Sequence, residues 1–109
     1  MSKNLDKEIF RQSVYDIVRL IPPGRATSYG AIAKAIGFPN LSRMVGKVMS
    51  QCGLAADDVP AHRVVNSQGG LAAGFCQMQE LLESEGVVVV NNRIQNWKKI
   101  FWNPLKEIL

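Results

Sequence analysis

The chain has 109 residues, of which 47% are hydrophobic, and this is enough apolar material for one modest core and too little for two. We therefore expect a single domain spanning residues 1–109. Thirteen Lys and Arg residues outnumber nine Asp and Glu residues, and the formal net charge of +4 suits a polyanionic partner without proving one.

The first predicted element is an amphipathic helix near the N-terminus. Its apolar residues recur at helical spacing and end before the breaker Pro22-Pro23-Gly24; they are Phe10, Val14, Ile17, Val18 and Ile21.

Two further short helices are predicted around a tight turn. Thr27 or Ser28 can cap a helix that runs through Ile36, and Gly37 with Pro39 stops it. A third helix then begins near Leu41. Two short helices joined in this way indicate a helix-turn-helix.

The third predicted helix has two distinct faces. One should pack in the core, while Arg43, Lys47 and Ser50 project from another side. The expected packing stripe consists of Leu41, Met44, Val45, Val48, Met49 and Cys52.

The last predicted elements are a helix over residues 77–85, ended by Gly86, and a β-hairpin. In the hairpin, residues 87–90 and 93–95 flank Asn91-Asn92, a pair that tolerates positive φ. The predicted fold is mainly α with a small β-hairpin wing, which is a winged helix-turn-helix.

One motif carries the sharpest functional information. Pro60-Ala61-His62-Arg63-Val64 resembles the Pro-Cys-His-Arg-Val active-site signature of the O6-alkylguanine-DNA alkyltransferases, with alanine in place of cysteine. Further blocks follow the family's order and spacing over about residues 10 to 86, which makes accidental similarity improbable. They are Ile21-Pro22-Pro23-Gly24, Ser28-Tyr29-Gly30, Ile32-Ala33, Ser42-Arg43-Met44-Val45-Gly46, Gly69-Gly70 and Leu81-Leu82-Glu83-Ser84-Glu85-Gly86.

The alanine changes what the resemblance implies. In the family the cysteine accepts the alkyl group irreversibly, and the methyl side chain of Ala61 cannot do so. The chain therefore resembles the alkyltransferase-like proteins, which implies a non-enzymatic sensor. Such a sensor binds O6-alkylguanine in double-stranded DNA by nucleotide flipping through the minor groove and flags it for nucleotide excision repair proteins.

The resemblance also assigns roles at the DNA interface. Arg43 would fill the hole left by the flipped nucleotide, and Tyr29 would crowd the nucleotide's phosphate. The alternatives are a solvated arginine and a packing tyrosine. The remaining expected DNA-binding residues are Ser42, Gly46 and Lys47.

His62 and Glu85 correspond to the family's proton relay. With no thiol to activate, we expect them to survive as a structural hydrogen bond rather than as catalytic residues. Arg63 would support the same loop, although it could also neutralise a phosphate.

The lesion pocket implied by the resemblance would select guanine through backbone hydrogen bonds to its edge. Ala61 is smaller than the cysteine of the transferases and the tryptophan of many alkyltransferase-like proteins, and we expect its space to accept the alkyl group by apolar contact. The expected lining residues are Tyr29, Ala61, Val64, Gly74, Phe75 and Cys76, where Phe75 replaces a tyrosine and is equally consistent with a core aromatic.

Two other functions remain open at this point. Cys76 could replace the missing alkyl acceptor, as in a methylated-DNA-cysteine methyltransferase homologue, or the chain could be a general winged-helix DNA-binding protein that never flips a base. Cys52 stands where the catalytic members place asparagine, and the domain that generally precedes theirs is expected to be absent, so both features favour a non-catalytic protein.

Composition supplies the remaining expectations. Two cysteines and one histidine argue against a disulfide framework or a zinc cluster, and we expect no metal and no cofactor. The N-terminus lacks a signal-peptide apolar stretch and no apolar run could span a bilayer, which favours a cytoplasmic protein without a membrane partner. We also expect a monomer. The tail over residues 97–109 should dock on the domain, the alternative being an exposed aromatic patch for a partner.

Overall fold

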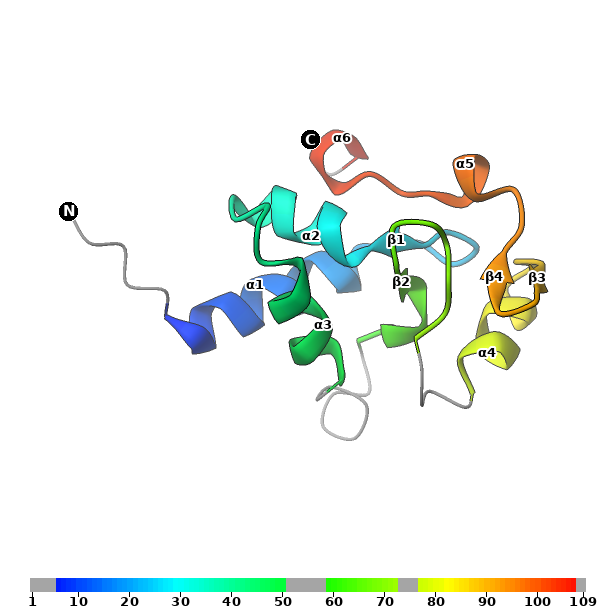
Figure 1. The fold of residues 1–109 in the computed structure, drawn as a ribbon, viewed down its shortest axis with the longest axis horizontal. Helices are drawn as coiled ribbons and strands as arrows, with labels where there is room; N and C mark the ends of the chain where they lie inside the picture. The colour runs from blue at the N-terminus through cyan, green and yellow to red at the C-terminus, as the bar shows by residue number, and fades with distance from the viewer. Residues whose placement is uncertain (1–5, 51–58, 73–76, 108–109) are drawn as a thin grey trace.

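The structure is a computed structural model that describes residues 6–50, 59–72 and 77–107. Three helices, α1 (Lys7–Arg19), α2 (Tyr29–Ile36) and α3 (Ser42–Ser50), pack at one end, and α4 (Met78–Ser84) lies at the other (Figure 1). Cys52, Gly74, Phe75 and Cys76 lie outside the described residues. Within these ranges no helix has both the length and the apolar character needed to cross a membrane.

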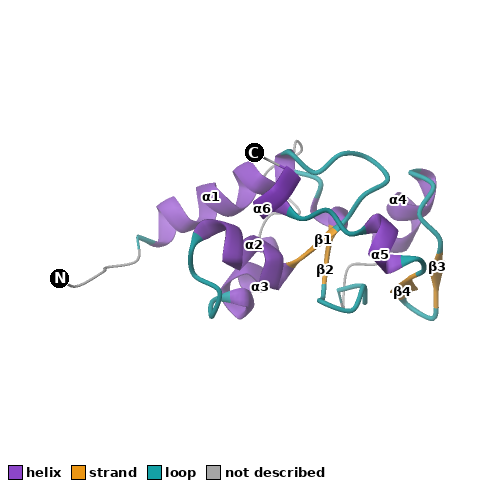
Figure 2. Ribbon diagram, turned by 90° about the horizontal axis from the view of Figure 1, so that it is seen from above, coloured by secondary structure: helices purple, strands orange, loops and turns teal. Residues whose placement is uncertain are grey.

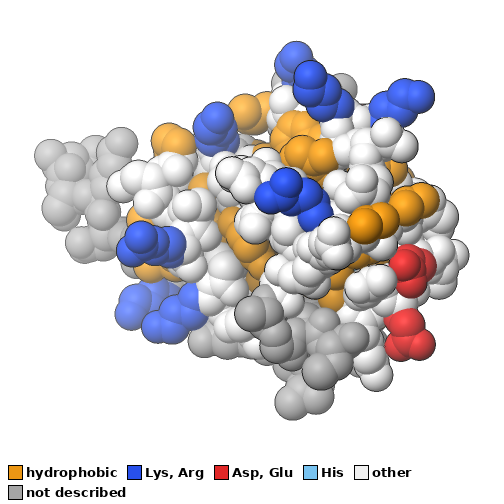
Figure 3. Space-filling model, turned by 45° about the vertical axis from the view of Figure 1, so that its right-hand side comes forward, with side chains coloured by type: hydrophobic (Ala, Val, Ile, Leu, Met, Phe, Trp, Pro, Cys, Tyr) orange, Lys and Arg blue, Asp and Glu red, His pale blue; other side chains and the backbone are white. Residues whose placement is uncertain are grey.

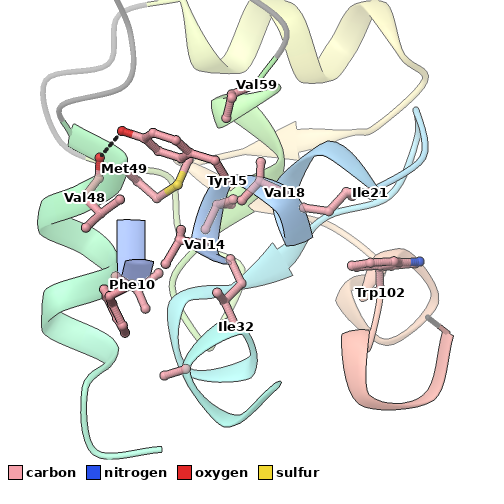
Figure 4. Close-up of a cluster of buried hydrophobic side chains, with 13 residues drawn as sticks. Phe10, Val14, Tyr15, Val18, Ile21, Ile32, Val48, Met49, Val59 and Trp102 are labelled. Atoms are coloured by element: carbon pink, nitrogen blue, oxygen red, sulfur yellow. Dashed lines mark hydrogen bonds between the residues drawn. The ribbon is translucent and has the colours of Figure 1, made fainter. Parts of the chain in front are cut away.

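The predicted first helix is confirmed. Asp6 caps α1, its side chain accepting hydrogen bonds from the amides of Glu8 and Ile9, and the helix ends before Pro22. Its apolar face enters the first core cluster, where the Tyr15 hydroxyl donates to the carbonyl of Val48 at 3.3 Å (Figure 4). This bond connects α1 directly to α3.

The helix-turn-helix is also confirmed. The Ser28 hydroxyl accepts from the Ala31 amide at 3.1 Å, and Gly37 ends α2 in the left-handed conformation at φ 101°. On α3 the buried residues are Val45, Val48 and Met49, and the exposed ones include Arg43, Lys47 and Ser50.

A short parallel pairing between β1 (Thr27–Ser28) and β2 (Val64–Val65) was not predicted. Thr27 pairs with Val64 and Ser28 with Val65. A 3-10 helix, η1 (Ala61–Arg63), leads into β2. The pairing therefore joins the start of the helix-turn-helix to the segment that carries the signature motif.

The wing is present with tighter bounds than predicted. Strands β3 (Val89–Val90) and β4 (Arg93–Ile94) pair antiparallel around Asn91 and Asn92, whose φ values are 52° and 63°. Together with α4 they cover a second core cluster built around Val65, Met78, Leu82 and Ile94. Figure 2 shows α4 and the hairpin side by side at the end of the molecule opposite the start of α1.

The C-terminal segment docks on the domain, as predicted, and forms two short helices that were not predicted. These are α5 (Trp97–Ile100) and α6 (Pro104–Glu107). Trp102 is 4% exposed and belongs to the first core cluster, so the alternative of an exposed partner patch does not hold for this residue. Trp97 is half-buried, and its indole nitrogen donates to the carbonyl of Ser67 at 3.1 Å.

The burial of Trp102 yields a stability prediction. Trp102→Ala should lower the free energy of unfolding by about 3 to 5 kcal/mol, because it leaves a cavity in the core cluster of α1, α2 and α3. Urea unfolding followed by circular dichroism measures the change. Leu105→Ala is the control in the same segment, since Leu105 is 47% exposed and its loss should cost about 0.5 kcal/mol or less. Equal costs in the two variants would contradict the docked arrangement.

Candidate nucleic-acid interface

Tyr29 lies at the junction of the two helix-turn-helix helices. It is the first residue of α2, and a Cβ built on Gly46 of α3 would lie 3.9 Å from its ring Cδ1 atom. The ring is half-buried and also packs against the first core cluster. Burial raises the pKa of the phenol above 10.0, so Tyr29 keeps its proton at neutral pH and can donate a hydrogen bond.

Arg43 and Lys47 present free positive charge on the exposed side of α3. Within the described residues neither side chain has a hydrogen bond or an ion pair, whereas Arg11, Arg25 and Arg63 each contact a carboxylate. Ser42, the first residue of α3, is partly buried. Unneutralised cations on the exposed face of a helix are available to bind phosphate.

The face of the molecule shown in Figure 3 agrees with a polyanionic partner. Lys and Arg side chains are spread over much of the face in Figure 3, while the acidic side chains visible on it lie at its right-hand edge. Charge of one sign over a broad face attracts a nucleic-acid backbone.

Ala61 begins η1 and is partly buried against the same core cluster that Tyr29 contacts. Its amide donates to the carbonyl of Val59 at 2.8 Å. Because Ser28 pairs with Val65, the segment that carries Ala61 and the segment that carries Tyr29 are held side by side. These two predicted site residues are thus connected through one pairing and one core.

The rest of the predicted pocket is described only in part. Val64 is 1% exposed and packs in the core, so it supports the η1 segment from behind and offers little surface to a ligand. The predicted lining residues Gly74, Phe75 and Cys76 lie outside the described ranges and stay predictions. In the described part of the chain, no three His, Cys, Asp or Glu side chains gather as metal ligands.

The carboxylate of Glu85 organises the region behind Ala61. His62 Nε2 lies 2.8 Å from its Oε2 atom, and the Arg63 guanidinium donates to both oxygens, with Nε at 3.1 Å from each. The Gly24 amide donates to Oε1 at 3.3 Å, and Arg63 Nη1 donates to the Ile21 carbonyl at 2.9 Å. The expected His62 and Glu85 hydrogen bond is present, and Arg63 binds the same carboxylate.

This environment changes the acidity of Glu85. Burial alone would raise its pKa, but hydrogen bonds from Arg63, His62 and the Gly24 amide outweigh burial and lower the pKa from 4.5 to about 2. The carboxylate is therefore charged throughout the neutral range and holds its donors in place.

The sequence is similar to proteins of a known DNA-repair family. Residues 9–87 match the sequence profile of the family described as 6-O-methylguanine DNA methyltransferase, DNA binding domain. Alkyltransferase-like protein 1 of Schizosaccharomyces pombe is 35% identical over 104 residues, which span 87% of this chain and 95% of that protein. The DNA base-flipping protein of Escherichia coli K12 is 34% identical over 105 residues, which span 93% of this chain and 81% of that protein.

The fold is also similar to that of a solved alkyltransferase-like protein. The chain is similar to S. pombe Atl1 solved in complex with damaged DNA containing O6-carboxymethylguanine, with a TM-score of 0.81 and 31% identity over 90% of this chain and 98% of that one. The fold and site therefore define a winged helix-turn-helix domain of the DNA-alkyltransferase type. The chain belongs to the 6-O-methylguanine DNA methyltransferase family, as one of its alkyltransferase-like members.

Sequence reasoning missed some of the residues that build this site. Gly24 and Ile21 belong to one of the family blocks, but the sequence does not indicate that their backbone groups bond to Glu85 and Arg63. Nor does it point to Arg25, whose side chain makes several contacts with the C-terminal segment. These partners are separated by tens of residues, so no local pattern could have revealed them.

The lowered pKa of Glu85 predicts an acid dependence of stability. The folded-state pKa lies below the ordinary value, so the stabilisation is complete above pH 4.5 and is lost as the pH falls from 4.5 toward 2. Glu85→Gln should be about 3 kcal/mol less stable at pH 7, because it removes the charge that pairs with Arg63, and it should lose less stability across that acid window. Urea unfolding at several pH values measures both effects.

Glu80→Gln is the matched control for this substitution. Glu80 lies on α4, the helix whose C-cap is Glu85, and is exposed, so its neutralisation should leave the stability at pH 7 and its acid dependence close to wild type. An acid dependence of Glu85→Gln as steep as that of the wild type would show that the Glu85 contacts do not stabilise the fold.

Proposed function

We propose that this protein binds O6-alkylguanine in duplex DNA, flips the damaged nucleotide out through the minor groove and leaves the alkyl group in place. The observation that carries the proposal is Ala61. It occupies the position of the family's nucleophile while the surrounding framework of His62, Arg63 and Glu85 is intact. A preserved site without its nucleophile supports recognition without transfer.

The names of the relatives support the same activity. One is called alkyltransferase-like and another a DNA base-flipping protein, and the structure of Atl1 contains DNA damaged at guanine O6. Alkylated duplex DNA is accordingly the ligand class that we propose for this chain.

Each step of the proposed binding has a residue suited to it. Extruding a nucleotide costs a few kcal/mol, so the protein must hold the distorted strand and occupy the gap in the stack. The free guanidinium of Arg43 can stack in the gap and attract phosphate, and the fixed ring of Tyr29 can crowd the backbone of the extruded nucleotide. The small side chain of Ala61 leaves apolar room for the alkyl group.

The consequence in the cell would follow from stable binding. A sensor that leaves the lesion in place needs a downstream repair system, and we propose nucleotide excision repair as that system. We further propose that the protein acts in the cytoplasm as a monomer and requires no cofactor.

Substitutions on α3 separate lesion recognition from general DNA binding. Arg43→Ala should weaken binding to an O6-methylguanine duplex about tenfold and reduce its preference over an intact duplex, because an unfilled gap penalises only the flipped state. Lys47→Ala removes a cation of the same helix and should weaken binding to both duplexes about equally. Fluorescence-anisotropy titrations of matched duplexes give both affinities.

The same titrations test the proposed function itself. A wild-type protein with equal affinity for damaged and intact duplex would be a general winged-helix DNA-binding protein, and a proportional loss on both duplexes in Arg43→Ala would remove this residue from lesion recognition.

A further inference from the structure

The C-terminal segment of residues 100–107 contacts the chain directly before the helix-turn-helix. The Ala26 amide donates to the Ile100 carbonyl at 3.1 Å, and the Trp102 amide donates to the Ala26 carbonyl at 2.7 Å. Ala26 and Phe101 thereby form a parallel bridge. This isolated bridge places the start of the segment beside the residues that lead into β1.

Arg25 anchors this segment from the side. Its Nε donates to the Ile100 carbonyl at 3.0 Å, and its Nη2 donates to the Phe101 carbonyl at 2.6 Å. The same guanidinium pairs with the Glu107 carboxylate, with Nη2 and Oε2 separated by 3.1 Å. The planar guanidinium has several N–H donors and can bind the two carbonyls and the carboxylate at once, which the single ammonium group of a lysine cannot do.

The anchor is linked to Tyr29 by a short stretch in which every residue is held. Ala26 is fully buried, and Thr27 and Ser28 pair with β2. The Ser28 hydroxyl then caps α2, whose first residue is Tyr29. Since no residue between Ala26 and Tyr29 is free to absorb a shift, a displacement of Ala26 moves the tyrosine as well.

The segment also supports the helix that carries Tyr29. Helix α6 packs against α2, and the two lie close together in Figures 1 and 2. Trp102, between α5 and α6, fills the core cluster against which Tyr29 packs. The bridge between Ala26 and Phe101, the contacts of Arg25 and the packing of Trp102 thus all act on residues 25–29.

We propose that residues 100–107 are a positioning element for base flipping and that Arg25 is the positioning residue that couples them to Tyr29. This inference rests on the proposed function. The segment lies outside the residues that match the family profile, 9–87, so the match itself assigns it no role. A tyrosine that resists the strain of an extruded nucleotide must sit on a rigid support, and this segment supplies that support.

The test compares nucleotide flipping with simple binding. A duplex that carries 2-aminopurine beside O6-methylguanine becomes more fluorescent when the neighbouring base leaves the stack. Arg25→Ala should bind intact duplex like the wild type but show an about threefold smaller fluorescence rise at saturation, because only the flipped state depends on the tyrosine. Arg25→Lys keeps the charge but loses the planar set of N–H donors, so its fluorescence rise should lie between those of the wild type and Arg25→Ala.

Two control variants separate positioning from general destabilisation. Leu105→Ala shortens an exposed side chain of the same segment and leaves every contact of Arg25 in place, so its fluorescence rise should stay near that of the wild type. Val89→Ala weakens the second core cluster in the wing and leaves the contacts of Arg25 in place, so it should also retain the full rise while the protein is folded.

A double substitution tests whether Arg25 acts through Tyr29. Adding Arg25→Ala to Tyr29→Ala should change the fluorescence rise no further, since the anchor has no tyrosine left to position. Additive losses, or a full rise in Arg25→Ala alone, would overturn the inference while leaving the proposed function intact. A wild-type protein that gives no rise would contradict the proposed function and this inference with it.

Discussion

The partly buried carboxylate of Glu85, with its hydrogen bonds, is the interaction on which the arrangement of the site depends. It collects hydrogen bonds from Gly24, His62 and Arg63, three groups from two distant parts of the chain, and Arg63 extends the contact to Ile21. Hydrogen bonds from these donors stabilise the negative charge, which burial alone would disfavour. Their effect outweighs that of burial and lowers the pKa to about 2. The turn after α1, the η1 segment and the end of α4 therefore stay together.

This network has a different meaning in a chain with alanine at position 61. In a transferase the same groups would surround a thiol and influence its reactivity. Here alanine stands at the position of the nucleophile, and the same groups keep the η1 segment in shape, with Ala61 held against the core that also carries Tyr29. The architecture of a transferase site is thus compatible with a site that only binds the lesion, because most of its interactions stabilise the backbone.

The parts of the fold predicted from sequence are those encoded locally. The spacing of Phe10, Val14 and Val18, the Ser28 cap and the left-handed Gly37 were enough to predict α1 and the helix-turn-helix, and the Asn91-Asn92 pair predicted the wing. The β1 and β2 pairing escaped prediction because strands of two residues show no alternation.

The candidate site was predicted unevenly for the same reason. The motif around Ala61 and the positions of Tyr29 and Arg43 could be assigned through the family resemblance. The role of Arg25 could not, because its acceptors lie 75 residues or more along the chain and include backbone carbonyls that carry no sequence signature. Likewise, an aromatic tail does not reveal which ring is buried, and only packing distinguishes Trp102 from Trp97.

The central claim is that the protein recognises O6-alkylguanine and does not remove the alkyl group. The most direct measurement is mass spectrometry of both protein and DNA after a long incubation with a saturating amount of O6-methylguanine duplex. The account predicts an unchanged protein mass and an intact lesion in DNA recovered from the complex. A methyl-sized gain in protein mass with loss of the lesion would contradict it, and peptide mapping would then show whether Cys76 or Cys52 had taken the place of the missing nucleophile.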